Sequence, residues 1–383
     1  MPAAVKWLGF AIGVGVALVT AGSAIRTLVV PRGGTSRIAL FVGHTIVRRG
    51  FLAMAKRFDD YESRDRILSL SAPLSLLANL LAWLLLFWVG FGLMLWPLVD
   101  GDLLTALRES GSSMLTLGYA GTPTFGATLV HFAAAVTGLV AVALQIAYLP
   151  TIYSAFNRRE NLVTLLQSRA GAPAWGPELL ARTALVDLRG ELPRLYGAWE
   201  EWAADVGESH SNYPVLAFFR SPVPLRSWIV GLLAVLDSAA LYLATCPGSA
   251  PVEARLCLRM GFVSLRDIAT VLRIPHDPDP YPDEPIRLTY EEYVAGIRRM
   301  EEAGFPMERT AEQAWADFRG WRVNYEAIVY AIADAVEAVP GPWTGERTRL
   351  PGMAIVPARP ANRRPDDPEA HREPKATRSH WRA

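Results

Sequence analysis

Two long stretches without a charged residue most constrain how this chain can fold. No Asp, Glu, Lys or Arg occurs between Arg66 and Asp100, and none occurs between Glu109 and Arg158. The centre of the first stretch, residues 80–88, consists almost entirely of leucine, tryptophan and phenylalanine. Because one helix crosses a bilayer with about 20 apolar residues, the sequence predicts an integral membrane protein.

A third apolar segment, residues 7–25, lies between Lys6 and Arg26. Residues 22–24 are small enough for a signal-peptidase site, so a cleaved secretory signal is the alternative to a first span. The segment that follows is rich in Arg and Lys, and short basic loops stay cytoplasmic. A retained span with an outer N-terminus satisfies that rule, whereas a cleaved signal would leave the basic segment outside.

The basic segment itself has a helical pattern. Apolar residues recur with helical spacing between Arg37 and Phe58. This pattern predicts either an amphipathic helix on the inner membrane surface or a solvated connecting helix.

The second and third long spans are expected from about residue 73 to 96 and from 127 to 149. Between them, residues 110–126 are small, hydroxylated and rich in glycine. Asp102 is a good N-cap for a short helix over 103–115, whose negative C-terminal end would favour a cation. Non-helical backbone is tolerated at membrane depth only where protein buries it or water lines it. The segment is therefore predicted to re-enter the membrane, the alternative being a loop that only packs a helical hairpin.

Four consecutive residues of this segment, Thr116-Leu117-Gly118-Tyr119, resemble the Thr-Val-Gly-Tyr-Gly filter of potassium channels. Over about residues 70–160 the chain resembles the bacterial two-span, pore-loop potassium channel family, with an extra N-terminal span. The resemblance implies that four copies surround a pore. It also implies that the loop binds a permeant monovalent cation, with K⁺ as the expected ion. The Thr116 hydroxyl and the backbone carbonyls along the loop would coordinate that ion. The residues expected to bind the ion are Thr116, Leu117, Gly118, Tyr119, Ala120 and Gly121.

The sequence departs from that family at the outer end of the loop. Ala120 occupies the place of the second filter glycine, Gly121 comes one position late, and Thr122 replaces the usual aspartate. A left-handed alanine costs on the order of 1 kcal/mol, so the outer half is predicted to differ in shape.

Two residues of the third span carry further predictions. Gly138 lies where the family has its hinge glycine, and close helix packing is the alternative role. His131 is expected to bond the short helix or a neighbouring subunit, with proton sensing as the alternative.

The rest of the chain has the pattern of a helical cytoplasmic domain. Helices are predicted at 160–169, 177–206, 226–245, 251–273, 289–303 and 310–338, one of them starting at a capping box from Thr289 to Glu292. Residues 228–244 form either a core helix, with Asp237 paired to Arg226 or Arg255, or a fourth span. Cys246 and Cys257 are expected to be reduced and buried, with a disulfide or reactive thiol as the alternative.

Composition and motifs exclude several functions. The net charge of +1 gives no reason to expect nucleic acid as a partner. The sequence has no GxSxG, P-loop, HExxH or dinucleotide motif, so an enzyme is not predicted and no cofactor is expected. His210 is interpreted as a surface histidine, and His276-Asp277 lacks the spacing of a metal site.

The predicted fold class is an all-α membrane protein with three transmembrane helices, a re-entrant pore helix and loop, and a helical cytoplasmic domain. The expected parts are a first span (1–30), a basic linker (31–70), a pore domain (71–157), a helical domain (158–339) and a disordered tail (340–383). The predicted function is a homotetrameric cation channel in the plasma (inner) membrane, in contact with membrane lipids. The alternative is a non-conducting, membrane-anchored scaffold or sensor derived from the channel hairpin.

Overall fold

The computed structural model describes residues 2–30, 36–345 and 355, and every regular element in them is a helix. Five of the described helices are long and apolar enough to cross a membrane: Ala3–Leu28, Arg37–Ala55, Tyr61–Leu95, Phe125–Ala170 and Trp228–Thr245. The prediction of an all-α chain with apolar helices is thereby confirmed. The chain forms two compact units, residues 1–155 with 212–219, and residues 156–211 with 220–383.

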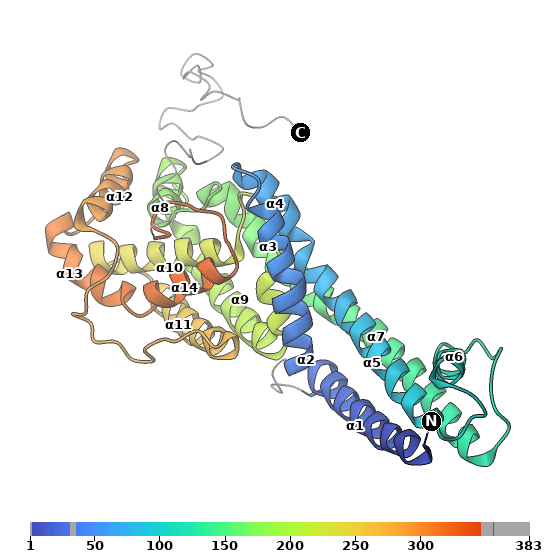
Figure 1. Ribbon diagram of the computed structural model, residues 1–383. Helices are drawn as coiled ribbons and strands as arrows, with labels where there is room; N and C mark the ends of the chain where they lie inside the picture. The colour runs from blue at the N-terminus through green and yellow to red at the C-terminus, as the bar shows by residue number, and fades with distance from the viewer. Residues whose placement is uncertain (1, 31–35, 346–354, 356–383) are drawn as a thin grey trace. The chain divides into compact units, whose positions relative to one another are not determined.

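The first unit is built around two antiparallel helices, α1 (Ala3–Leu28) and α5 (Ser71–Leu95), which lie side by side (Figure 1). A Cβ on Gly13 would collide with the Gly90 backbone, so only glycine allows this approach. Small residues at a helix crossing let membrane helices pack backbone to backbone. Farther along, the Trp83 indole donates to Ser23 Oγ over 2.9 Å.

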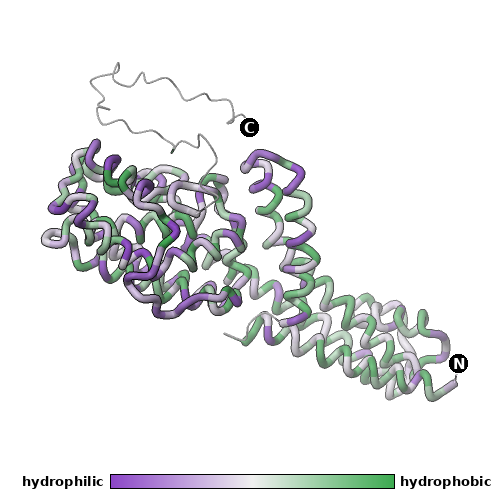
Figure 2. Tube along the Cα trace, turned by 60° about the vertical axis from the view of Figure 1, so that its left-hand side comes forward, coloured by the Kyte–Doolittle hydropathy of each residue, from purple (hydrophilic) through white to green (hydrophobic). Residues whose placement is uncertain are grey.

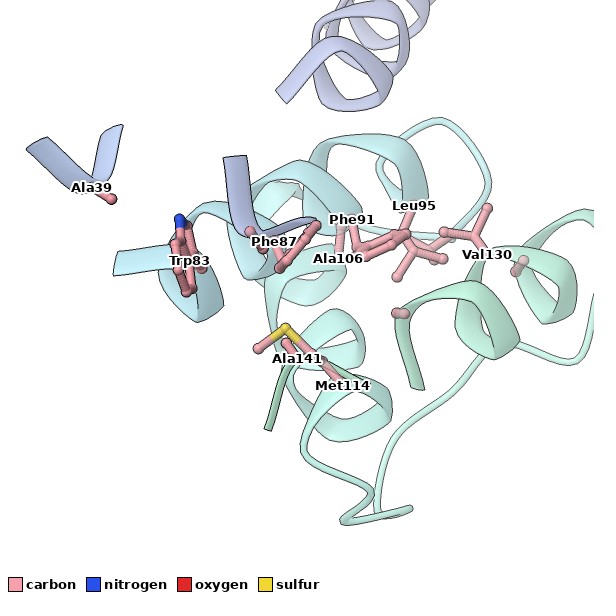
Figure 3. Packing of buried hydrophobic residues seen from close by; sticks show 13 residues of the cluster. Ala39, Trp83, Phe87, Phe91, Leu95, Ala106, Met114, Val130 and Ala141 are labelled. Atoms are coloured by element: carbon pink, nitrogen blue, oxygen red, sulfur yellow. The ribbon is translucent and has the colours of Figure 1, made fainter. Parts of the chain in front are cut away.

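The core of this unit follows one face of α5. Trp83, Phe87, Phe91 and Leu95 recur every fourth residue, which places them on a single stripe (Figure 3). The stripe packs against α6 (Leu103–Met114) and the first half of α7 (Phe125–Ala170), whose residues in the cluster are Ala106, Met114, Ala127, Val130, Ala134 and Ala141. Alanines opposite aromatic rings bring the helices close together, and this closeness fixes where the α6–α7 loop starts and ends.

The basic linker is helical along most of its length: α2 (Arg37–Leu40), the π-helix η1 (Phe41–Arg48), α3 (Arg49–Ala55) and α4 (Tyr61–Ser69). The predicted helix from Arg37 is confirmed. It packs on α5, where Ser75 Oγ donates to the Gly43 carbonyl over 3.3 Å.

The predicted break between a helix ending near Pro150 and a separate helix over 160–169 is wrong. α7 is one helix of 46 residues that continues through Pro150 to Ala170 and absorbs the predicted helix 160–169. Proline removes one backbone hydrogen bond, and membrane helices tolerate this where neighbouring groups compensate. The amide that Pro150 lacks is the one that would donate to the Ile146 carbonyl, and the Thr151 hydroxyl donates to the next carbonyl, that of Ala147, over 3.5 Å.

The second unit packs its helices around α10 (Trp228–Thr245), whose residues are nearly all buried inside the unit (Figure 1). Residues 228–244 therefore form the predicted core helix. The surrounding helices are α8 (Gly176–Leu185), α9 (Leu192–Asn212), α11 (Val252–Leu272), α12 (Tyr290–Glu302), α13 (Ala311–Arg322) and α14 (Glu326–Ala335). The capping box at Thr289 is confirmed, and Thr310 with Gln313 forms a second one. Along these helices polar and apolar residues alternate far more than along α1 and α5 (Figure 2).

Two predicted helices of this unit are broken in the structure. The single helix expected over 177–206 divides into α8 and α9, with left-handed Asp187 and the short helix η2 (Arg189–Glu191) between them. The helix expected over 310–338 divides into α13 and α14. The turn between α13 and α14, residues 323–325, contains no proline or glycine, so the sequence pattern gave no sign of it. The first break does have such signals, Gly190 in η2 and Pro193 at the start of α9, which the prediction of one helix overlooked.

The boundaries between the parts differ in detail from the expected ones. The first unit ends at Ala155 and also includes residues 212–219, with the short helix η3 (Pro214–Phe218). Within it, Tyr213 packs edge-on against Tyr148 with ring centroids 5.6 Å apart. The second unit extends beyond 339, because Trp343 is buried in it. The rest of the expected tail, 346–383 apart from residue 355, lies outside the described residues.

Candidate functional site

The short helix predicted before the loop is present as α6. The Asp102 carboxylate accepts hydrogen bonds from the Thr105 amide and hydroxyl, each over 2.9 Å, which fixes the helix start. Two bonds tie α6 to α5: Trp88 Nε1 donates to the Leu107 carbonyl and Ser110 Oγ donates to the Trp88 carbonyl. The helix that carries the loop is therefore held at its start and along its length.

One buried serine organises the loop after α6. The Ser112 carbonyl accepts from the amides of Leu117 and Gly118, over 2.8 and 3.3 Å. The Ser112 hydroxyl accepts from the amides of Tyr119 and Ala120, each over 3.0 Å. Four consecutive amides of the filter-like sequence thus point back to a single residue.

The carbonyl oxygens of the same backbone differ from its amides, because they accept no hydrogen bond from the described residues. Within the described part of the chain, no hydrogen bond ends on a carbonyl oxygen of residues 116–121. Buried or membrane-embedded carbonyls need a partner. Water, a cation or another chain can supply one, and this polarity is what ion coordination by backbone requires.

Left-handed and other backbone conformations alternate only over the first half of the loop, from Thr116 to Tyr119. Thr116 and Gly118 have φ of 57° and 69°, in the left-handed region, and Leu117 between them does not. Ala120 and Gly121 are not left-handed. The alanine thus avoids the expected strain, and the alternation that turns successive carbonyls to one side stops at Tyr119.

A buried carboxylate holds the C-terminal end of the loop. Glu109 on α6 accepts from the Thr122 amide over 3.1 Å and from the Thr122 hydroxyl over 2.8 Å. His131 on α7 lies against the same group, with Nε2 3.2 Å from a Glu109 oxygen. Its Nδ1 is 2.7 Å from Ser113 Oγ. His131 therefore contacts the short helix, as one reading of the sequence expected.

Gly138 lies beneath the loop. A Cβ at this position would overlap the carbonyl oxygen of Met114, the last residue of α6. The close approach of α7 to the end of α6 thus requires glycine. The packing role expected for Gly138 is present in the structure.

The side chains of the loop are outside this packing. Leu117 and Tyr119 are each 61% exposed, and Thr116, Gly118 and Gly121 are exposed as well. Of the six predicted residues only Ala120 is half-buried. The six residues are consecutive in the loop, and five of them are exposed to solvent in the single chain.

Sequence reasoning missed the two residues that hold this loop, Ser112 and Glu109. Ser112 was visible only as one of several small hydroxylated residues. Glu109 was counted with the acidic outer loop, yet it is 7% exposed. The available signal was the position of both residues on the predicted helix, three residues apart and therefore on the same side of it.

The second unit contains charged groups buried in its core. The predicted partners of Asp237 are wrong: Arg322 bonds its carboxylate, and Tyr325 donates to it over 2.7 Å. Arg322 also donates to Glu326 and to the Trp343 carbonyl, each over 2.9 Å. Burial raises the pKa of Asp237 to about 6, while the Arg322 charge opposes that rise.

His210 is buried as well, which corrects its interpretation as a surface residue. The Arg159 guanidinium lies 3.2 Å from His210 Nε2, and Trp228 packs on the ring. Burial, reinforced by the Arg159 charge, lowers the pKa of His210 well below 6.5. The imidazole is therefore neutral and accepts from Arg159, which is a structural role.

Chemistry of other kinds finds no support in the described residues. No three His, Cys, Asp or Glu side chains among them are placed to hold a metal ion. Cys246 and Cys257 are free and buried, and burial raises the pKa of both thiols. Comparisons with protein families, with curated proteins and with solved structures found no match to this chain.

Proposed function

We propose that this chain is one subunit of a potassium-channel-like cation channel. The observation that carries the proposal is the two-sided loop after α6. Its amides at 117–120 all turn to Ser112, while the carbonyls of 116–121 accept no bond in the described residues. Backbone carbonyls presented in this way can replace the water around a monovalent cation.

The proposed channel needs several copies of the chain, because each copy has one such loop. A pore of this kind closes only when several copies bring their loops to one axis, and four is the number that the family resemblance implies. The C-terminal end of α6 points its partial negative charge to the start of the loop, which favours cations. Asp100 and Asp102 in the exposed turn before α6 would raise the local cation concentration.

The proposed topology uses α1, α5 and the first half of α7 as three spans in the plasma (inner) membrane. α6 and its loop re-enter from the outer side. The basic segment after α1 and the second unit are then cytoplasmic, in keeping with the positive-inside rule. In this arrangement the second unit assembles or gates the pore, and K⁺ is the first permeant ion to test.

A second candidate function is a non-conducting membrane scaffold or sensor. Two observations favour it: alternation stops before Ala120, and Glu109 ties down the outer end of the loop. A scaffold needs neither four copies nor an open carbonyl path, so the mass of the detergent-solubilised protein separates the two proposals. A monomer would rule out the channel.

The decisive experiment is ion flux through purified protein in liposomes, first with K⁺ and then with Na⁺ as the only cation. Gly118→Ala tests the loop directly, because a Cβ there meets no atom and acts only through the left-handed backbone. The matched control is Gly22→Ala, also in open space but on a helix with ordinary dihedrals. We expect K⁺ flux that Gly118→Ala abolishes and Gly22→Ala preserves.

The other outcomes are equally informative. Equal flux of K⁺ and Na⁺ would retain the pore and discard potassium selectivity. Flux that survives Gly118→Ala would remove the loop from the conduction path. Tetrameric protein without flux in any condition would favour the scaffold.

A further inference from the structure

The segment after α1 has an unusual charge pattern. From residue 27 to 58 the sequence contains no Asp or Glu. The described cations of this segment are Arg37, Arg48, Arg49, Lys56 and Arg57. We name residues 36–58 the basic segment.

One face of the basic segment is fixed to the apolar helices. Ser36 Oγ, at its start, is 2.6 Å from Ser23 Oγ near the end of α1. Gly43 packs against Ser75 and Asn79 of α5. The segment is thus held beside two of the candidate spans.

The opposite face carries apolar and basic side chains together. Phe41 and Ile46 are 58% and 56% exposed, and Met54 and Phe58 are exposed as well. Arg37, Arg49, Lys56 and Arg57 are also exposed. Among the described residues, none of these four cations forms an ion pair.

Helices with this composition bind membrane surfaces. The apolar side chains reach the acyl boundary while Lys and Arg meet lipid phosphates. Although the helix Arg37–Ala55 is long enough to span, adjacent Arg48 and Arg49 near its middle disfavour burial in hydrocarbon. A solvated surface would leave four large apolar side chains in water without a partner.

We propose that the exposed face of the basic segment docks on anionic phospholipid headgroups of the bilayer that holds α1 and α5. The charge of the segment favours anionic lipid. Its five cations, with no acidic residue, would be repelled by a cationic surface and would gain little binding energy from a zwitterionic one. This inference rests on the membrane location of the chain and not on ion conduction, so a flux result leaves it intact.

The test is a fluorescence measurement on the full chain in vesicles. Met54→Cys carries an environment-sensitive fluorophore. Cys246 and Cys257 are buried, and wild-type protein treated with the same fluorophore shows whether they react. Vesicles are made of phosphatidylcholine alone or with phosphatidylglycerol. We expect a blue shift in the anionic vesicles only, reversed by high salt and not produced by inorganic phosphate added to phosphatidylcholine vesicles.

Paired neutralisations identify the side chains responsible. Lys56→Gln with Arg57→Gln should weaken docking about thirtyfold, because each cation near an anionic surface contributes about fivefold to the affinity. Arg259→Gln with Arg298→Gln removes the same charge from exposed sites in the second unit and should leave the shift unchanged. Size-exclusion chromatography verifies that each variant is folded. If the double variant does not fold, the single variant Lys56→Gln replaces it.

Three results would overturn the proposal. Identical emission in both vesicle types would show that lipid charge plays no part. Blue emission already in phosphatidylcholine alone would mean that the segment is a span. An equal loss of the shift in both variant pairs would assign it to net charge and not to this face.

Discussion

The Glu109 carboxylate accepts both hydrogen bonds that Thr122 can donate, one from its amide and one from its hydroxyl. The two residues lie on opposite sides of the loop, thirteen positions apart in the chain. Glu109 is buried, so these bonds also satisfy a charge that has little access to water.

Breaking this pair should loosen the C-terminal end of the loop. Glu109→Ala leaves two Thr122 donors without their acceptor, and bonds to a charged group contribute about 1.5–3 kcal/mol each. Thr122→Val removes only the hydroxyl donor. A double-mutant cycle on thermal unfolding should give a coupling of about 1 kcal/mol or more. Strictly additive effects of the two substitutions would mean that the bond from the Thr122 hydroxyl to Glu109 contributes nothing to stability.

Gly138→Ala should separate α7 from the end of α6. The new Cβ overlaps the Met114 carbonyl oxygen, and overpacking of this kind costs about 1–3 kcal/mol. Gly126→Ala on the same helix is the control, because its Cβ meets Leu98 at an ordinary 3.5 Å. The unfolding temperature should fall for the first variant only. A hinge role alone would change flux and leave stability as it was.

His210 should make the protein less stable in mild acid. Its pKa in the folded chain lies well below 6.5, so below about pH 6.5 the unfolded chain binds a proton that the folded chain does not. Stability is therefore complete above that pH and falls below it, by at most about 1.4 kcal/mol per pH unit. His210→Gln keeps an acceptor for Arg159 and should show a smaller loss between about pH 7.5 and 5.5 in thermal unfolding.

Arg322→Met should be one of the most destabilising substitutions in the second unit. It leaves Asp237 and Glu326 buried without their shared cation, which costs about 3–5 kcal/mol. Without Arg322 the folded-state pKa of Asp237 rises further above its unfolded value, so stability should recover as the pH falls from neutral. Arg259→Met, on the exposed side of α11, should change little. A variant equally unstable at every pH would contradict this account.

The sequence predicted the features that depend on residues close together in the chain, namely helix starts and apolar helices. The N-cap at Asp102, the capping box at Thr289 and the helix before the loop all follow from side chains within four residues of each other. Apolar runs identified the candidate spans in the same way, since length and charge alone decide them.

The failures have a common cause, which is that tertiary contacts decided the outcome. Asp237 pairs with Arg322, 85 residues away, while the nearer Arg226 bonds Thr164 and Gln167. His210 reads as polar surface because nothing nearby reveals Arg159, 51 residues earlier. α7 passes Pro150 because packing along a long helix outweighs one lost hydrogen bond.

The bonds around Ser112 have a consequence for how the protein is made. Every bond that shapes the loop joins residues at most thirteen positions apart, from Glu109 to Thr122. Contacts so close in sequence form early, because little chain entropy is lost in closing them. During synthesis the loop can therefore take its shape as soon as the chain has emerged through Thr122, before α7 is complete. In the proposed channel, the copies would then meet with this loop already folded, so assembly would join prefolded surfaces.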